Sequence, residues 1–156
     1  MQLSSPAFAD GERMPIEVSA RDVNELPQLE ILGVPERAQS LALILEDLDS
    51  PLGDVTHWLV WNLPPDTHCV DALHLPSEGR VGMDAFGKVG YLGPIPPEGC
   101  HHYRFRVLAL DAELELEAGA TRSQFDAAAE GHVLAAADLT GALCSADEGA
   151  DPDAPG

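Results

Sequence analysis

The stretch LALILEDLDSPLGDVTHWLVWNL, residues 41–63, decides the fold class of this chain. Two mainly apolar runs of strand length, Leu41–Leu45 and Trp58–Leu63, stand on either side of a polar segment that contains proline and glycine. An unbroken apolar run of this length is typical of a strand buried on both faces, and proline with glycine marks a turn. We therefore predict two buried strands here, the second of which ends before Pro64 and Pro65.

Two later segments alternate apolar and polar residues. In residues 103–109, Tyr103 and every second residue after it are apolar, while Arg104 and Arg106 lie between them. Residues 113–117 alternate leucine with glutamate in the same way. A period of two predicts strands with one face in water. Gly- and Pro-rich loops separate these strands, above all in residues 82–99.

The signal for helix is confined to the last quarter of the chain. Thr121 followed by Gln124 fits a capping box, and we expect a short helix over residues 125–130 that ends at Gly131. Residues 132–137 fit a helix or a strand equally well. Many strands with little helix predict a mainly β fold, an antiparallel sandwich or barrel.

Length and composition indicate one globular domain. The chain has 156 residues, of which 45% are hydrophobic, enough for a single packed core. We expect the domain to cover residues 1–144 and residues 145–156, which are acidic and contain two prolines, to form a disordered tail. No apolar run approaches the roughly 18 residues of a membrane span. The first residues carry no basic group or long apolar run, so they do not fit a secretory signal and we expect a cytoplasmic protein.

The number and spacing of the cysteines also favour a cytoplasmic location. Cys69, Cys100 and Cys144 are odd in number and widely spaced, without a Cys-x-x-Cys pair. We therefore expect reduced thiols, as in a cytosol, and no disulfide framework.

The charge excludes some partners. Acidic residues outnumber basic ones by 27 to 8, for a net charge of −19, and such a surface repels nucleic acid and anionic membranes. Acidic runs can be interaction segments. Here the carboxylates are spread along the chain and Lys88 is the only lysine, which favours adaptation to a high-salt cytoplasm.

Several blocks of residues together resemble one known family. They are Asp47-Leu48-Asp49-Ser50-Pro51, Thr56-His57-Trp58, the segment GKVGYLGPIPPEG at 87–99 and HHYRF at 101–105. In this order they resemble the bacterial and archaeal branch of the phosphatidylethanolamine-binding-protein-like, or Raf kinase inhibitor-like, family. The resemblance runs from residue 3 to about residue 143. It implies a Greek-key sandwich of two antiparallel sheets, with one or two short helices near the C-terminus and a small anion pocket at one end.

The resemblance also implies the residues of that pocket: Asp47, Pro51, His57, Gly93, Pro96, Pro97, His101 and Tyr103. Histidine nitrogens can donate charge-assisted hydrogen bonds to a phosphate, and a neighbouring carboxylate can orient an imidazole. The expected ligand is a phosphate-bearing small molecule or a lipid head group, with a kinase or a protease as an expected protein partner. No catalytic residue, cofactor or metal is implied.

The chain departs from the family pattern at several positions. Leu48 stands where a proline is usual, and His102 stands where an arginine is usual. Ile31 and Met83 replace an expected tryptophan and asparagine. Because Leu48 and His102 adjoin the predicted pocket, they raise the question of whether it still binds an anion.

Three alternatives remain open beside a non-enzymatic binding protein. A small hydrolase could use the pocket His, Asp and Cys residues, although Cys100 and His101 are adjacent on a strand and would face opposite sides. A metal site could use the same residues, but their spacing matches no known metal motif. A homodimeric scaffold with a vestigial pocket is the third.

Overall fold

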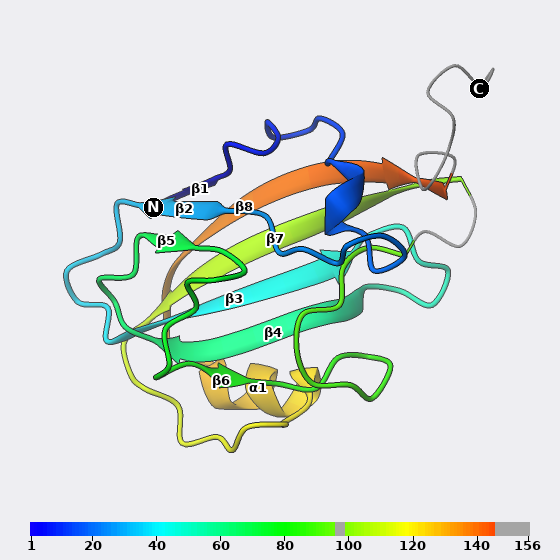
Figure 1. The fold of residues 1–156 in the computed structure, drawn as a ribbon. Coiled ribbons are helices and arrows are strands. Elements are labelled where there is room, and N and C mark those ends of the chain that lie inside the picture. Colours follow the sequence, from blue (N-terminus) through cyan, green and yellow to red (C-terminus); the bar gives the residue numbers. More distant parts are fainter. Residues whose placement is uncertain (96–98, 146–156) are drawn as a thin grey trace.

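The computed structural model describes residues 1–95 and 99–145, and these form two antiparallel sheets packed face to face (Figure 1). The larger sheet has the order β6 (Arg80–Val81), β4 (Val55–Leu63), β3 (Ser40–Asp47), β7 (Cys100–Leu110) and β8 (Val133–Cys144). The smaller sheet has the order β1 (Gln2–Ser4), β2 (Leu29–Leu32) and β5 (Cys69–Val70). The predicted mainly β sandwich is confirmed. Of the predicted tail, residues 146–156 lie outside the described part of the chain.

The central strand β3 is buried along its whole length, as the apolar run predicts. Leu41, Leu43 and Leu45 face the core between the two sheets, while Ala42 and Ile44 face a second core on the opposite side of the large sheet. Side chains alternate between faces along a strand, so the part of β3 that lies between the two cores, residues 41–45, is apolar on both faces. Each fully buried leucine contributes about 1.5–3 kcal/mol to this packing.

The second core is closed by the helix α1 (Arg122–Ala129), which lies beside β4 and β6 in Figure 1. The predicted capping box is present: the Gln124 amide donates to the Thr121 side chain, and the Gln124 side chain accepts from the Thr121 amide. The helix therefore begins at residue 122 rather than 125. Phe125 is buried against Trp61 of β4. A single turn of 3₁₀ helix, η1 (Ile16–Val18), lies near the N-terminus, and residues 133–144 form a strand.

The strand predicted over residues 113–117 is not formed. The Asn62 side-chain amide donates to the Leu114 carbonyl at 2.9 Å and accepts from the Leu114 N–H at 2.8 Å. Asn62 itself has a left-handed backbone, with φ of 58°. Because one side chain satisfies both backbone groups of Leu114, this segment is held against β4 without a partner strand.

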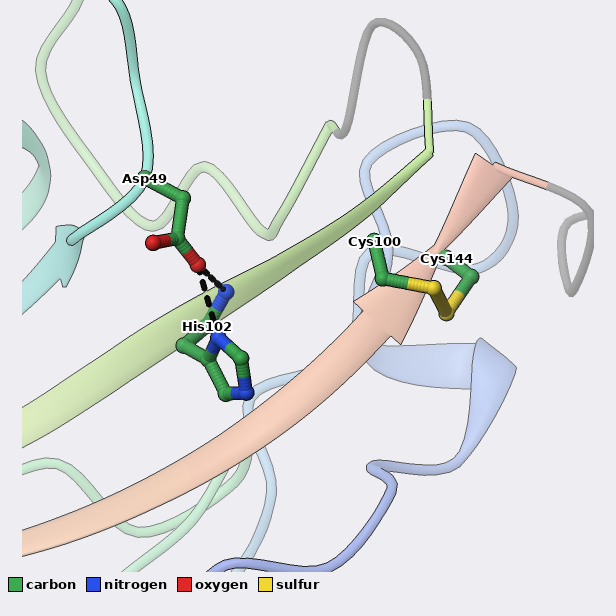
Figure 2. Close-up of a disulfide and its surroundings, with 4 residues drawn as sticks. All are labelled: Asp49, Cys100, His102 and Cys144. Atoms are coloured by element: carbon green, nitrogen blue, oxygen red, sulfur yellow. Dashed lines mark hydrogen bonds and ion pairs between the residues drawn. A yellow bond between two sulfur atoms is a disulfide. The ribbon is translucent and has the colours of Figure 1, made fainter.

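The expectation of reduced thiols is wrong for two of the three cysteines. Cys100 and Cys144 form a disulfide across β7 and β8, with Cα atoms 3.9 Å apart (Figure 2). Cys69 is free. The two bonded cysteines are 44 residues apart in sequence, and only the register of the two strands brings them opposite each other.

Candidate functional site

Four of the predicted pocket side chains gather on the inner face of the large sheet. Asp47 at the end of β3 is the cross-strand partner of Tyr103 on β7, and His101 lies two residues before Tyr103 on the same face. The ring of His57, from β4, lies 5.7 Å from the Tyr103 ring, and the His101 ring lies 6.3 Å from it on centroids. All four residues are buried, with at most 8% of their surface exposed.

The orientation of His101 is fixed by Asp47. Asp47 Oδ2 lies 2.8 Å from His101 Nδ1, and Asp47 Oδ1 accepts a hydrogen bond of 2.9 Å from the Asp49 amide. Both carboxylate oxygens are thereby engaged. Because an ionised carboxylate only accepts, His101 Nδ1 carries the hydrogen and Nε2 is the nitrogen left for a further contact.

The orientation of His57 is fixed by backbone carbonyls. His57 Nδ1 lies 3.0 Å from the Gly93 oxygen and 3.2 Å from the Leu92 oxygen. Carbonyl oxygens only accept, so Nδ1 carries the hydrogen here too. Burial lowers the pKa of His57, and the two carbonyls with the charges of Asp47 and Asp84 offset only part of that effect. His57 is thus a mainly neutral ring near pH 7.

The loop that carries Gly93 is held by residues that the sequence did not single out. Asn24 Oδ1 accepts from the Gly93 amide at 2.7 Å, and Asn24 Nδ2 donates to the Tyr91 carbonyl at 3.0 Å. Ser19 Oγ donates to the Pro94 carbonyl at 2.9 Å. Asn24 has a φ of 57°, a conformation that asparagine adopts more readily than most residues. Nothing in the sequence near Asn24 points to a contact 69 residues away.

The structure describes one of the three predicted prolines. Pro51 lies exposed in the turn after β3. Pro96 and Pro97 lie outside the described residues.

The side chain of Cys100 does not face the buried cluster. Cys100 is exposed whereas His101 is buried, as expected for adjacent residues of one strand. The sulfur of Cys100 is bonded to Cys144, so it is not a thiolate beside His101. Across residues 1–95 and 99–145, no three His, Cys, Asp or Glu side chains are gathered as a metal site would require.

Comparison with known proteins identifies the family. The profile of the phosphatidylethanolamine-binding protein family matches residues 4–143 of this chain. The chain belongs to the phosphatidylethanolamine-binding protein family. Its relatives include a UPF0098 protein of Methanothermobacter thermautotrophicus, 43% identical over 146 residues, in an alignment that covers 90% of this chain and 97% of the relative.

Solved structures of family members have the same fold. A structure described as a phosphatidylethanolamine-binding protein homologue from Chlamydia trachomatis aligns with a TM-score of 0.85 and 36% identity, covering 91% of this chain and 95% of that one. The structure of YbcL from E. coli, described as a new member of the mammalian family, also gives a TM-score of 0.85, at 27% identity, covering 92% of this chain and 97% of that one.

Leu48 and His102, which adjoin the predicted pocket residues in the sequence, take part in a brace beside the buried cluster. His102 Nδ1 and the His102 amide both lie 2.7 Å from Asp49 Oδ2 (Figure 2). The Leu48 amide donates to the His102 carbonyl at 2.9 Å, a bond that a proline at this position could not make. Asp49 and Leu48 thus tie the end of β3 to β7 in this family member.

None of the described helices is long and apolar enough to cross a bilayer.

Proposed function

We propose that this chain is a non-enzymatic binding protein whose cluster of Asp47, His57, His101 and Tyr103 accepts phosphate or a phosphorylated head group. One observation carries the proposal. The two imidazoles flank one tyrosine, and each is fixed through Nδ1 by a protein acceptor. Each therefore has Nε2 available in a preset direction. Because these side chains are already oriented, little of their conformational freedom is lost when a ligand binds.

The chemistry of the two nitrogens favours an anion that itself carries a proton. A protonated imidazole donates from Nε2, whereas a neutral imidazole accepts there. Because burial lowers the pKa of His57, its Nε2 accepts near pH 7 unless the ligand supplies a proton. A phosphate monoester, with a second pKa near 6, can supply it through its P–OH group. The complex then needs one proton shared between His57 and the ligand.

Family membership supports the same class of ligand and leaves the partner as a proposal. We propose a phosphate-bearing small molecule or lipid head group as the ligand, and regulation of a kinase or a protease through a protein contact as a further role. We also propose a cytoplasmic location and a homodimer. No observation on the described residues favours a hydrolase.

The test is a titration with inorganic phosphate and with phosphorylethanolamine at pH 6 and pH 8, followed by histidine and backbone NMR shifts at constant chloride. We expect saturable shifts at Asp47, His57, Gly93 and His101. We expect affinity to be several-fold weaker at pH 8, because the shared proton is lost from both His57 and the phosphate. The double variant His57→Ala, His101→Ala should lose the response.

A matched control is His74→Ala, because His74 is an exposed histidine that also pairs with an aspartate, Asp71. This variant should bind as the wild type does. Equal affinity for phosphate at pH 6 and pH 8 would contradict a proton shared between His57 and the ligand. An absence of shifts with both ligands at pH 6 would refute anion binding at this cluster.

A further inference from the structure

The disulfide closes the last rung of the β7–β8 pair. Cys100 lies directly opposite Cys144, and the neighbouring hydrogen bond runs from the Ser145 amide to the Gly99 carbonyl at 2.9 Å. This flanking bond marks Cys100 and Cys144 as a non-hydrogen-bonded pair, in which no backbone bond joins the two residues themselves. At this rung the covalent bond therefore replaces backbone pairing.

The next rung carries a histidine of the buried cluster. His101 follows Cys100 and lies opposite Leu143. Strand ends fray when their terminal pairs are not held. The disulfide is thus the nearest restraint on the backbone of His101 from its N-terminal side, and Asp47 restrains its side chain from the other direction.

Strand β8 is held independently of the disulfide. On its outer side the Met14 amide donates to the Ala142 carbonyl at 2.9 Å, and the Ala142 amide donates to the Glu12 carbonyl at 3.0 Å. Cleavage of the disulfide would therefore leave β8 in place and loosen the end of β7 at Cys100, where the Ser145–Gly99 hydrogen bond would still join the two strand ends. The part that gains freedom is the part that leads into His101.

The two cysteines differ in exposure. Cys100 is exposed, whereas Cys144 is buried with 5% of its surface accessible. Figure 2 shows both residues at the ends of their strands. Thiol–disulfide exchange requires a thiolate to approach one sulfur, so an external thiol meets Cys100 first.

We propose that Cys100–Cys144 is a thiol–disulfide exchange site for small thiols, and that its redox state controls the position of His101 and the affinity of the anion cluster. A small thiolate attacks Cys100 Sγ, the bond to Cys144 breaks, and Cys144 leaves as a thiolate that takes up a proton. A second thiolate attacks the external sulfur of the mixed disulfide. This releases Cys100 as a thiol and the small molecule as its own disulfide. Two small thiols are oxidised for each protein disulfide reduced, and the small disulfide reverses the reaction.

This proposal rests on the proposed function for its effect on affinity, and the experiment separates the two. The full chain is compared oxidised and after reduction with dithiothreitol, by phosphate titration at pH 6, by histidine NMR and by amide hydrogen exchange. We expect reduction to weaken phosphate binding by about tenfold, the loss expected when one of two charge-assisted hydrogen bonds is no longer oriented. The His101 signals should shift, and amide exchange at Cys100 and His101 should accelerate while Ala142 stays protected.

Two variants control the experiment. Cys100→Ser with Cys144→Ser should reproduce the reduced protein and show no response to the thiol. Cys69→Ser, which removes the free thiol of β5, should respond as the wild type does. Unchanged His101 signals and unchanged exchange on reduction would overturn the proposal. If those signals change but phosphate binds neither form, control of His101 stands and the proposed anion function fails.

Discussion

At the scale of single residues, Gly93 is the glycine that leaves least room for an added side chain. A Cβ at this position would collide with the Val18 carbonyl oxygen and meet Asn24 Oδ1 at 3.0 Å. The Gly93 carbonyl accepts from His57, and the Gly93 amide donates to Asn24. Gly93 therefore links His57 of the cluster to the N-terminal segment that contains Val18 and Asn24. Only a residue without a side chain can lie this close to the Val18 backbone.

We expect Gly93→Ala to lower the free energy of unfolding by about 2–4 kcal/mol, because the backbone of Val18 cannot yield as a flexible side chain could. It should also weaken phosphate binding, since the carbonyl that holds His57 must move. Chemical denaturation and NMR titration measure the two effects. Gly119→Ala is the control: its φ is +87° and no atom lies within 4 Å of the added Cβ. It should cost about 1–2 kcal/mol and bind normally. Equal losses in the two variants would contradict the collision.

At the scale of elements, β3 presents different chemistry on its two faces. Asp47 belongs to the buried cluster with His101, and its neighbour Glu46 faces away, with 3% of its surface exposed. Glu46 lies 3.0 Å from Arg104 on β7 and 3.0 Å from Arg122 on α1. Burial opposes the charge of Glu46, but hydrogen bonds and charges from Arg104 and Arg122 outweigh burial and lower the pKa of Glu46. One carboxylate thus joins two strands and the helix.

We expect Glu46→Gln to destabilise the fold by about 2–3 kcal/mol at pH 7, less than for a fully buried pair, because both arginines are partly exposed. The lowered pKa of Glu46 gives a stabilisation that is complete above its ordinary value of 4.5 and is lost as the pH falls through the folded value. The difference from wild type should therefore shrink in acid. Denaturation at pH 7 and pH 4 tests this, with exposed Glu115→Gln as control. A difference that does not change with pH would refute the ionic role.

At the scale of the whole molecule, repulsion among carboxylates opposes folding. A net charge of −19 on 156 residues is confined to a small surface when the chain folds. At 0.1 M salt the Debye length is about 10 Å, and at 1 M about 3 Å. Screening at high salt therefore removes most of the repulsion between neighbouring carboxylates.

We expect the thermal midpoint of the oxidised protein to fall by roughly 10 °C or more when salt is lowered from 2 M to 0.05 M sodium chloride. The lost screening costs a few kcal/mol, and each kcal/mol shifts the midpoint by about 2–4 °C in a domain of this size. Calorimetry at several salt concentrations measures it. A midpoint that is unchanged in dilute buffer would argue against adaptation to high salt.

The sequence by itself determined the features that depend on near neighbours. The apolar runs at Leu41–Leu45 and Trp58–Leu63 became β3 and β4, and Thr121 with Gln124 became the start of α1. Each is set by periodicity or by a cap within four residues. The motifs also named Asp47, His57, His101 and Tyr103, which the fold brings together.

Only the tertiary structure decided the contacts between distant segments. The Cys100–Cys144 bond, the Asn24 support of the Gly93 loop and the Asn62 bridge to Leu114 join residues 44, 69 and 52 positions apart. Local sequence propensity cannot predict such pairs, because the register of the strands and the path of the loops decide which distant residues meet. Residues 113–117 show the same limit: they alternate like a strand, but Asn62 satisfies the backbone of Leu114 and no neighbouring strand does.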